Sequence, residues 1–179
     1  MKKIDVSTKK HPNVFALVDD DAPREAFLFK WHVDGDGYIR RSSSKIFGGQ
    51  KFLHHVVIGK KDGSVVDHID GDKLNNQKSN LRFCSKSQNS MNQVGKHRPS
   101  GLKGVTYSNS GGKMVWMARI CVDYKSIYIG RYETEKEAAM AYDKAAIKYH
   151  KEFARLNFPD QLHPSLGDMI IRDFARRMK

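Results

Sequence analysis

The fold of this 179-residue chain is decided in its middle by VVDHIDG (65–71), NLRF (80–83) and SKSQNSMN (85–92). Val65 and Val66 form a short apolar run that predicts a strand, and Gly71 permits a turn after it. Residues 81–83 predict the return strand. Ser85 is a preferred helix-capping residue, so a helix is expected to follow. The pattern therefore predicts two strands and a helix, with the first strand delivering its polar end to a cleft.

This stretch also places an imidazole close in sequence to oxygen ligands. Hydrolysis of a phosphodiester at neutral pH needs a base to make the nucleophile from water and a cation to hold the charge that builds on the phosphate. His68 is the candidate base, and Asp67 and Asn89 are the candidate metal ligands. Taken singly, an Asp-His pair is usually a surface turn and Asn75-Asn76 a loop, but the combination favours chemistry. Two protein oxygens, completed by water and phosphate, suit magnesium or manganese better than zinc.

Four separated elements in this order resemble the HNH endonucleases of the ββα-metal fold, in their phage and homing branch. The elements are Leu53-His54, Asp67-His68-Ile69-Asp70-Gly71, Asn80-Leu81-Arg82 and Gln88-Asn89. The resemblance extends from about Phe15 to Asn92. It implies that His68 is the general base and that Asp67 and Asn89 hold one divalent cation.

The same resemblance implies two supporting roles. Asn80 would brace the loop that orients His68. His54 would support the site from a strand at 52–58, although a histidine on an apolar strand is as often a satisfied structural residue. His55 stands where the family commonly has arginine, a departure that bears on a phosphate contact and leaves the catalytic set intact.

Composition points to a polyanionic partner. The chain has 32 Lys plus Arg against 20 Asp plus Glu, so its formal net charge is 32 − 20 = +12, and the sequence pI is about 9.7. No stretch approaches the roughly 20 apolar residues that span a bilayer, and no signal-like leader follows Met1, so we expect a soluble, cytoplasmic protein without membrane contact. In a phage-encoded protein, that means the host cytoplasm. Cys84 and Cys121 are too isolated for a zinc ribbon or a disulfide framework.

The second half reads as a separate module. Residues 95–101 are polar and contain Gly, Pro and Ser, as expected of a linker. Three strand-like runs follow at 102–107, 114–122 and 126–132, and Thr134-Glu135-Lys136-Glu137 then forms a capping box for a helix. Small residues on that helix would pack against the sheet. The inward candidates on the strands are Trp116, Ala118, Ile120, Ile127 and Ile129.

This half resembles the plant Apetala-two and ethylene-response-factor DNA-binding domain, a three-stranded sheet packed on one helix. The matching residues run from about Ser100 to Pro159 and include Trp116 to Ile120 and Tyr128-Ile129-Gly130. The resemblance implies that the outer sheet face lies in a groove of DNA. The residues expected to contact DNA are Lys103, Thr106, Ser108, Arg119, Cys121, Ser126 and Tyr128. Several of these positions hold arginine or tryptophan in the plant proteins, so the plant target sequence is not carried over.

The sequence thus predicts an α+β protein with a ββα-metal HNH nuclease domain at 1–97 and an Apetala-two-like domain at 98–160. A basic helix is expected at 161–179. The expected function is metal-dependent hydrolysis of phosphodiester bonds in duplex DNA, with magnesium or manganese, no small-molecule cofactor and a monomer favoured. Two alternatives stay open. One is a DNA-binding regulator whose nuclease half is inactive, and the other is an RNA-directed nuclease or RNA-binding protein.

Overall fold

The structure is a computed structural model that describes residues 1–41, 51–93, 100–110 and 112–161. The chain forms two compact units, Met1–Asn89 and Ser90–Lys179. The helix predicted at 161–179 lies outside the described residues except for its first position, as does most of the predicted linker. No helix in the described ranges is long and apolar enough to cross a membrane.

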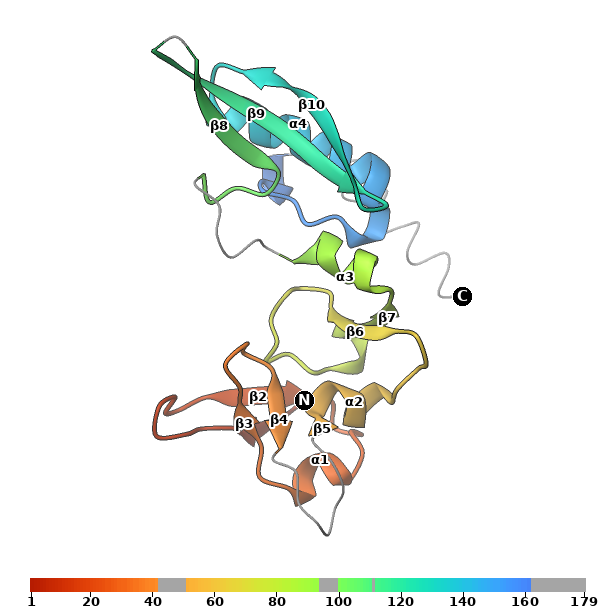
Figure 1. The fold of residues 1–179 in the computed structure, drawn as a ribbon. Helices are drawn as coiled ribbons and strands as arrows, with labels where there is room; N and C mark the ends of the chain where they lie inside the picture. The colour runs from red at the N-terminus through yellow and green to blue at the C-terminus, as the bar shows by residue number, and fades with distance from the viewer. Residues whose placement is uncertain (42–50, 94–99, 111, 162–179) are drawn as a thin grey trace. The chain divides into compact units, whose positions relative to one another are not determined.

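The first unit is built from short strands and short helices (Figure 1). Its described residues form three antiparallel sheets, which pair β1 with β2, β3 with β4 and β4 with β5, and β6 with β7. Its elements are β1 Lys2–Asp5, β2 Phe15–Val18, α1 Glu25–Leu28, β3 His32–Val33, β4 Ile39–Arg41, β5 Lys51–Phe52, α2 Leu53–Ile58, β6 Val65–His68, the 3-10 turn η1 Lys78–Asn80, β7 Leu81–Cys84 and the start of α3 Lys86–Asn92.

The predicted strand, return strand and helix are present in the predicted order as β6, β7 and α3. The hairpin register sets Asp67 opposite Arg82 and His68 opposite Leu81. Ser85 begins α3 through a reciprocal cap, because its hydroxyl accepts from the Gln88 backbone N–H at 3.1 Å while the Gln88 side chain accepts from the Ser85 N–H at 2.9 Å. Both bonds satisfy amide groups that the first helical turn leaves open.

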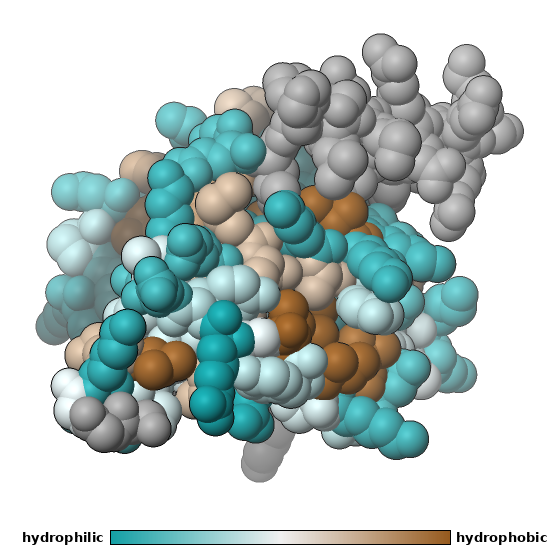
Figure 2. Space-filling view, turned by 90° about the horizontal axis from the view of Figure 1, so that it is seen from above, coloured by the Kyte–Doolittle hydropathy of each residue, from teal (hydrophilic) through white to brown (hydrophobic). Residues whose placement is uncertain are grey.

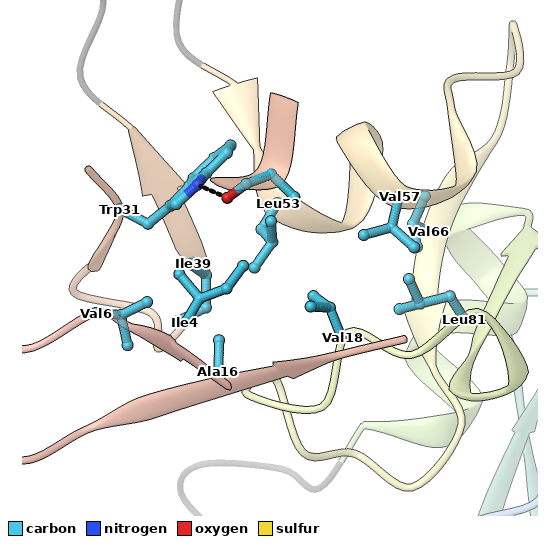
Figure 3. Close-up of a cluster of buried hydrophobic side chains, with 11 residues drawn as sticks. Ile4, Val6, Ala16, Val18, Trp31, Ile39, Leu53, Val57, Val66 and Leu81 are labelled. Atoms are coloured by element: carbon cyan, nitrogen blue, oxygen red, sulfur yellow. Dashed lines mark hydrogen bonds between the residues drawn. The ribbon is translucent and has the colours of Figure 1, made fainter. Parts of the chain in front are cut away.

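One apolar core ties this hairpin to the rest of the first unit. Figure 3 shows Val66 and Leu81 of the hairpin near Val57 of α2, in the cluster that also holds Val18 of β2. Trp31 is fully buried, and its indole N–H donates to the Ala26 carbonyl at 2.8 Å. The strand that carries Asp67 and His68 is therefore fixed by the packing of its apolar residues.

The strand predicted at 52–58 is wrong, because Leu53–Ile58 forms the helix α2. The run Val56-Val57-Ile58 favours a strand by propensity. Leu53 and Val57, however, are spaced by four residues, so a helix brings both to one face, and both are buried in the core. Gly59 ends the helix with φ 84°, where a side chain would be strained. His54 is thus presented from a helix rather than from a strand.

The second unit is a three-stranded antiparallel sheet with one long helix across a face of it (Figure 1). The strands are β8 Val105–Ser110, β9 Lys113–Val122 and β10 Lys125–Tyr132, in the order β10-β9-β8, followed by α4 Glu135–His150, η2 Lys151–Phe153 and η3 Pro159–Gln161. The predicted sheet-on-helix arrangement is confirmed. So is the helix start, because Thr134 and Glu137 form both bonds of a capping box.

The core of the second unit consists of small residues on α4 set against the middle of the sheet. Ala138, Ala139 and Ala146 are fully buried and pack with Ala118 and Ile120 of the sheet. Trp116 and Ile129 are partly buried against the same clusters. Ile127 pairs with the buried Ile120 and so lies on the helix side of the sheet, as expected, but on the edge strand β10 it is 38% exposed and stays outside these clusters.

Gly104 directly precedes β8 at a point where the Tyr142 ring of α4 leaves no room for a side chain. Its φ is 76°, and a Cβ atom there would lie 1.8 Å from Cδ2 of Tyr142. Gly101 provides a matched control, because its φ is 70° and a Cβ atom added there would have nothing within 4 Å. We expect Gly101→Ala to cost about 1 kcal/mol of unfolding free energy from the backbone alone, and Gly104→Ala to cost at least about 2 kcal/mol more from the clash with the ring. Urea unfolding of both variants measures the difference, and equal losses would contradict the close packing.

Candidate functional site

Asp67 and His68 lie at the end of β6, and both are buried. Across the hairpin, Arg82 Nε and a terminal guanidinium nitrogen approach Asp67 Oδ2 at 2.9 and 2.8 Å. Charge-assisted bonds of this kind are among the stronger polar contacts in proteins. The first acidic residue of the site is therefore held in place by a cation from the partner strand.

His68 is set against the loop that follows it. Its Nε2 lies 3.3 Å from Asn76 Oδ1. Burial lowers the pKa of His68 below its ordinary value, while the Asn76 contact and the nearby carboxylates of Asp70 and Asp67 act in the opposite direction. The net effect favours a neutral imidazole at neutral pH, which is the form that accepts a proton.

Asn80 closes the loop between β6 and β7. Its side-chain nitrogen donates to Asp70 Oδ1 at 2.8 Å and to the Asn75 carbonyl at 2.9 Å, and its side-chain oxygen accepts from the Asp70 backbone N–H at 3.0 Å. The Asn80 carbonyl also accepts from the Ile69 N–H at 2.8 Å. These bonds join the segment after His68 to the start of the return strand.

The ring of His54 packs beside the ring of His68. The two ring centroids are 5.4 Å apart at an interplanar angle of 83°, and His54 stacks on Phe52 at 5.2 Å. Its Nδ1 is buried and has no hydrogen-bond partner among the described residues. Burial, followed by the charges of His55 and His68, lowers the pKa of His54 to about 3. His54 is therefore neutral near pH 7, and its ring packs against that of His68.

Asn89 lies in the middle of α3 and is partly buried. The described contacts do not join its side chain to Asp67. No cluster of three or more His, Cys, Asp or Glu side chains in the described ranges could enclose a metal ion by itself. One carboxylate and one carboxamide nevertheless fit a magnesium-type ion, which commonly takes one or two protein oxygens together with water and substrate phosphate.

Two residues of this site were given no role by the sequence pattern. Arg82 belongs to the quoted motif, but only the register of β6 with β7 shows that it faces Asp67. Asn76 reads as an ordinary loop residue, yet it is 1% exposed and contacts His68. The alternation of residues along two paired strands could have identified Arg82, whereas the Asn76 contact depends on the loop conformation.

The outer face of the sheet in the second unit is polar and exposed. Arg119 and Tyr128 are cross-strand neighbours, with the guanidinium 5.8 Å from the ring centroid, and Cys121 faces Ser126. The residues predicted for this face that are exposed are Thr106, Ser108, Arg119, Cys121, Ser126 and Tyr128. Because α4 packs on the opposite face, these side chains are available to a partner of the sheet. Figure 2 shows a face of the molecule on which hydrophilic residues surround a smaller hydrophobic area.

A β-bulge adds Arg131 to this outer face. Tyr128 pairs with Arg119, but Gly130 rather than Ile129 pairs with Ala118, and Arg131 then pairs with Met117. Counting every second residue from Tyr128 assigns Arg131 to the helix side, whereas the extra residue in the bulge reverses the alternation. Arg131 is exposed, so the sequence reasoning missed a second arginine on the outer face.

The structure places Lys103 elsewhere than the expected DNA-contacting face. Lys103 is 6% exposed, and its ammonium group donates to the carbonyls of Ser90, Met91 and Gln93, all within the second unit. These are carbonyls at the end of α3, where a positive charge is favourable. A buried ammonium with this set of acceptors is a structural cap, so the expectation of a DNA contact is corrected at this position.

Comparison with known proteins identifies both parts of the chain. Residues 51–91 match the HNH endonuclease profile, and residues 100–152 match the AP2 domain profile. An uncharacterized HNH endonuclease of Acanthamoeba polyphaga mimivirus is 31% identical over 145 residues, which cover 80% of this chain and 74% of that protein. Protein 3.8 of Escherichia phage T7 is 31% identical over 94 residues, covering 52% of this chain and 75% of that protein.

An AP2-like ethylene-responsive transcription factor of Arabidopsis thaliana is 45% identical over 61 residues, which cover 33% of this chain and only 10% of the plant protein. The fold and the site thus define a two-part protein with an HNH endonuclease domain and an AP2 domain. The chain belongs to the HNH endonuclease family.

The burial of His54 predicts how the free energy of unfolding depends on pH. His54 binds a proton less readily in the folded chain, with a pKa of about 3, than at its ordinary value of 6.5. The free energy of unfolding is therefore unaffected by His54 above pH 6.5. It falls as the pH drops from 6.5 toward 3, because in this range the unfolded chain binds a proton at His54 and the folded chain does not. At about 1.4 kcal/mol per pKa unit, the loss at pH 5 reaches up to about 2 kcal/mol. His54→Phe should reduce the loss between pH 7 and pH 5 by this amount, leaving the smaller share of His55 and His68.

Urea unfolding at pH 7 and pH 5 measures this effect in a Trp116→Phe background, where Trp31 is the remaining tryptophan and reports on the first unit. His11→Gln, at an exposed position, is the control and should keep the wild-type pH dependence. An unchanged dependence in His54→Phe would show that another group is responsible.

Proposed function

We propose that this protein is a metal-dependent endonuclease that hydrolyses phosphodiester bonds in duplex DNA. In this proposal residues 1–97 form the nuclease domain, and residues 98–160 form a domain that recognises DNA. The observation that carries the proposal is the buried, neutral His68 directly beside the Asp67–Arg82 pair, in a chain of the HNH endonuclease family. Both parts of the chain, together with the net charge of +12, favour DNA as the partner.

His68 would take a proton from the attacking water, while the bonds of Asn80 hold the loop behind it. Asp67 and Asn89 would hold the divalent ion, for which we propose magnesium or manganese. When bound, such an ion supplies positive charge at the scissile phosphate and at the leaving oxygen. Arg82 keeps Asp67 in a fixed rotamer and adds positive charge near an anionic substrate. His54 would shield one side of the His68 imidazole from water, and Phe52 stacks on His54.

The outer sheet face would supply DNA affinity. Arg119 and Arg131 bring two positive charges to neighbouring positions on β9 and β10, and Tyr128 beside Arg119 offers an aromatic surface. Contacts to phosphate give affinity that falls as salt concentration rises. The polar side chains of Thr106, Ser108 and Ser126 are available for hydrogen bonds but lack the paired donors with which arginine reads guanine.

One observation favours the alternative of an inactive DNA-binding regulator. Asp67 is already ion-paired with Arg82, so a metal ion would have to share this carboxylate with a guanidinium group. Cleavage and binding assays on the same DNA separate the two functions. A regulator would bind without cutting under any metal condition.

His68→Ala tests the nuclease proposal directly. We expect the wild type to nick or linearise supercoiled plasmid in magnesium or manganese and to be inactive with chelator. General-base catalysis contributes about 10²- to 10⁴-fold, so His68→Ala should lose about that factor in rate while plasmid binding persists. His11→Ala, at an exposed position, should cleave like the wild type. Plasmids carrying random genomic fragments supply a wide choice of target sites, and wild-type binding without cleavage across them would favour the regulator.

Arg119→Ala and Arg131→Ala test the outer sheet face. If each arginine contacts a phosphate, each variant should lower by about one the slope of log affinity against log salt concentration. Lys144→Ala provides a charge-matched control, because Lys144 is exposed on α4, which packs on the opposite face of the sheet. Fluorescence anisotropy with a labelled duplex over a salt series measures the slopes. Equal slopes in all three variants would show that this face does not bind the DNA backbone.

A further inference from the structure

We propose that Asn76 is a positioning residue that fixes the tautomer of His68, so that Nε2 carries the proton and Nδ1 is the atom that receives the proton of the attacking water. The assignment of Nδ1 as the reacting atom rests on the proposed function. The assignment of the tautomer does not, because it follows from the hydrogen bonds around Asn76.

The orientation of the Asn76 amide is settled by its nitrogen. Asn76 Nδ2 lies 3.0 Å from the Lys73 carbonyl and 3.2 Å from the Leu74 carbonyl. A carbonyl oxygen can only accept, so the side-chain atom facing the two carbonyls must be the NH₂ group. The other amide atom, the one that faces His68, is therefore the oxygen.

The backbone around Asn76 holds this orientation. Its N–H donates to the Leu17 carbonyl at 2.8 Å, and the Leu17 N–H donates to the Leu74 carbonyl at 2.8 Å. Both bonds tie the loop to β2, a strand whose Ala16 and Val18 are fully buried. Asn76 itself is 1% exposed. Turning the amide over would set its oxygen against the Lys73 and Leu74 carbonyl oxygens in a buried place, which is costly because none of these oxygens can donate.

The tautomer follows from the valence of the imidazole. A neutral histidine has one N–H donor and one nitrogen with a lone pair. Because Asn76 Oδ1 accepts and does not donate, the Nε2 atom 3.3 Å from it must be the donor. The lone pair is then on Nδ1, and the neutral ring that acts as a base must use that nitrogen. A rigid acceptor behind the ring also fixes the direction in which Nδ1 points.

Nitrogen NMR of the imidazole rings of the full chain, without metal or DNA, tests the tautomer. His68 signals are assigned by their loss in His68→Ala. We expect wild-type Nε2 at a protonated shift and Nδ1 at an unprotonated shift, and we expect both to move toward intermediate values in Asn76→Ala. Asn75→Ala is the matched control, because the Asn75 side chain bonds to Asp70 and Gln77 in the same loop rather than to His68. Its His68 shifts should remain those of the wild type.

A cleavage assay in magnesium on the same variants then tests the reacting atom, and Asn76→Ala should be slower by about 10²-fold through loss of orientation. A protonated Nδ1 in the wild type overturns the proposal even if Asn76→Ala does not fold. Unchanged shifts in a folded Asn76→Ala also overturn it, since another group would then fix the ring. If the wild type cleaves no DNA, the proposed function fails, while the NMR result still decides the tautomer.

Discussion

The pairing of β6 with β7 is the constraint on which the site depends. Its register sets Asp67 against Arg82 and places His68 at the end of the strand, where the loop begins. A shift of either strand by one residue would turn its side chains to the opposite face, so that Val66 of β6 or Leu81 of β7 would leave the core. Because both of these residues are buried in the core, the apolar packing selects the register that also assembles the polar site.

The loop between β6 and β7 is held in one conformation by side-chain and backbone hydrogen bonds. Asn80 joins its two ends, and Asn76 anchors its middle to β2 while contacting His68. The acidic residues at 19–21 have a related task, since Asp19 accepts from the Lys78 N–H at 2.7 Å and from the Gln77 side chain at 3.3 Å. Amide and carboxylate side chains thus replace an apolar core in a segment too short to have one.

Burial gives the histidines different tasks. His54 packs among the rings of Tyr38, Phe52 and His55 and has the more strongly lowered pKa, whereas Asn76 and nearby carboxylates partly offset the lowering of the His68 pKa. Neutral imidazoles result in both cases, but only His68 is linked to the polar loop by a side-chain hydrogen bond. In the second unit, the same principle of close packing governs a different arrangement, where alanines on α4 let the helix approach the sheet and leave the outer face exposed.

The sequence by itself determined the two-part organisation, the strands and helix around the site, the sheet of the second unit and the capped start of α4. Each of these has a local signal, such as the capping residues Ser85 and Thr134 or the apolar run at Val65-Val66, and local signals depend on neighbours in the chain. Only the tertiary structure decided that residues 53–58 form a helix, because burial of Leu53 and Val57 outweighed the strand propensity of a β-branched run.

Tertiary structure also decided the partners of the site residues. The Arg82 contact with Asp67, the Asn76 contact with His68 and the burial of Lys103 beneath the end of α3 each join residues through the folding of an intervening loop. Arg131 reaches the outer face because one extra residue in a bulge reverses the alternation of β10. Sequence spacing specifies which chemical groups are present, but distances between groups far apart in the chain are set by how loops close and strands pair, and these depend on the packing of the whole unit.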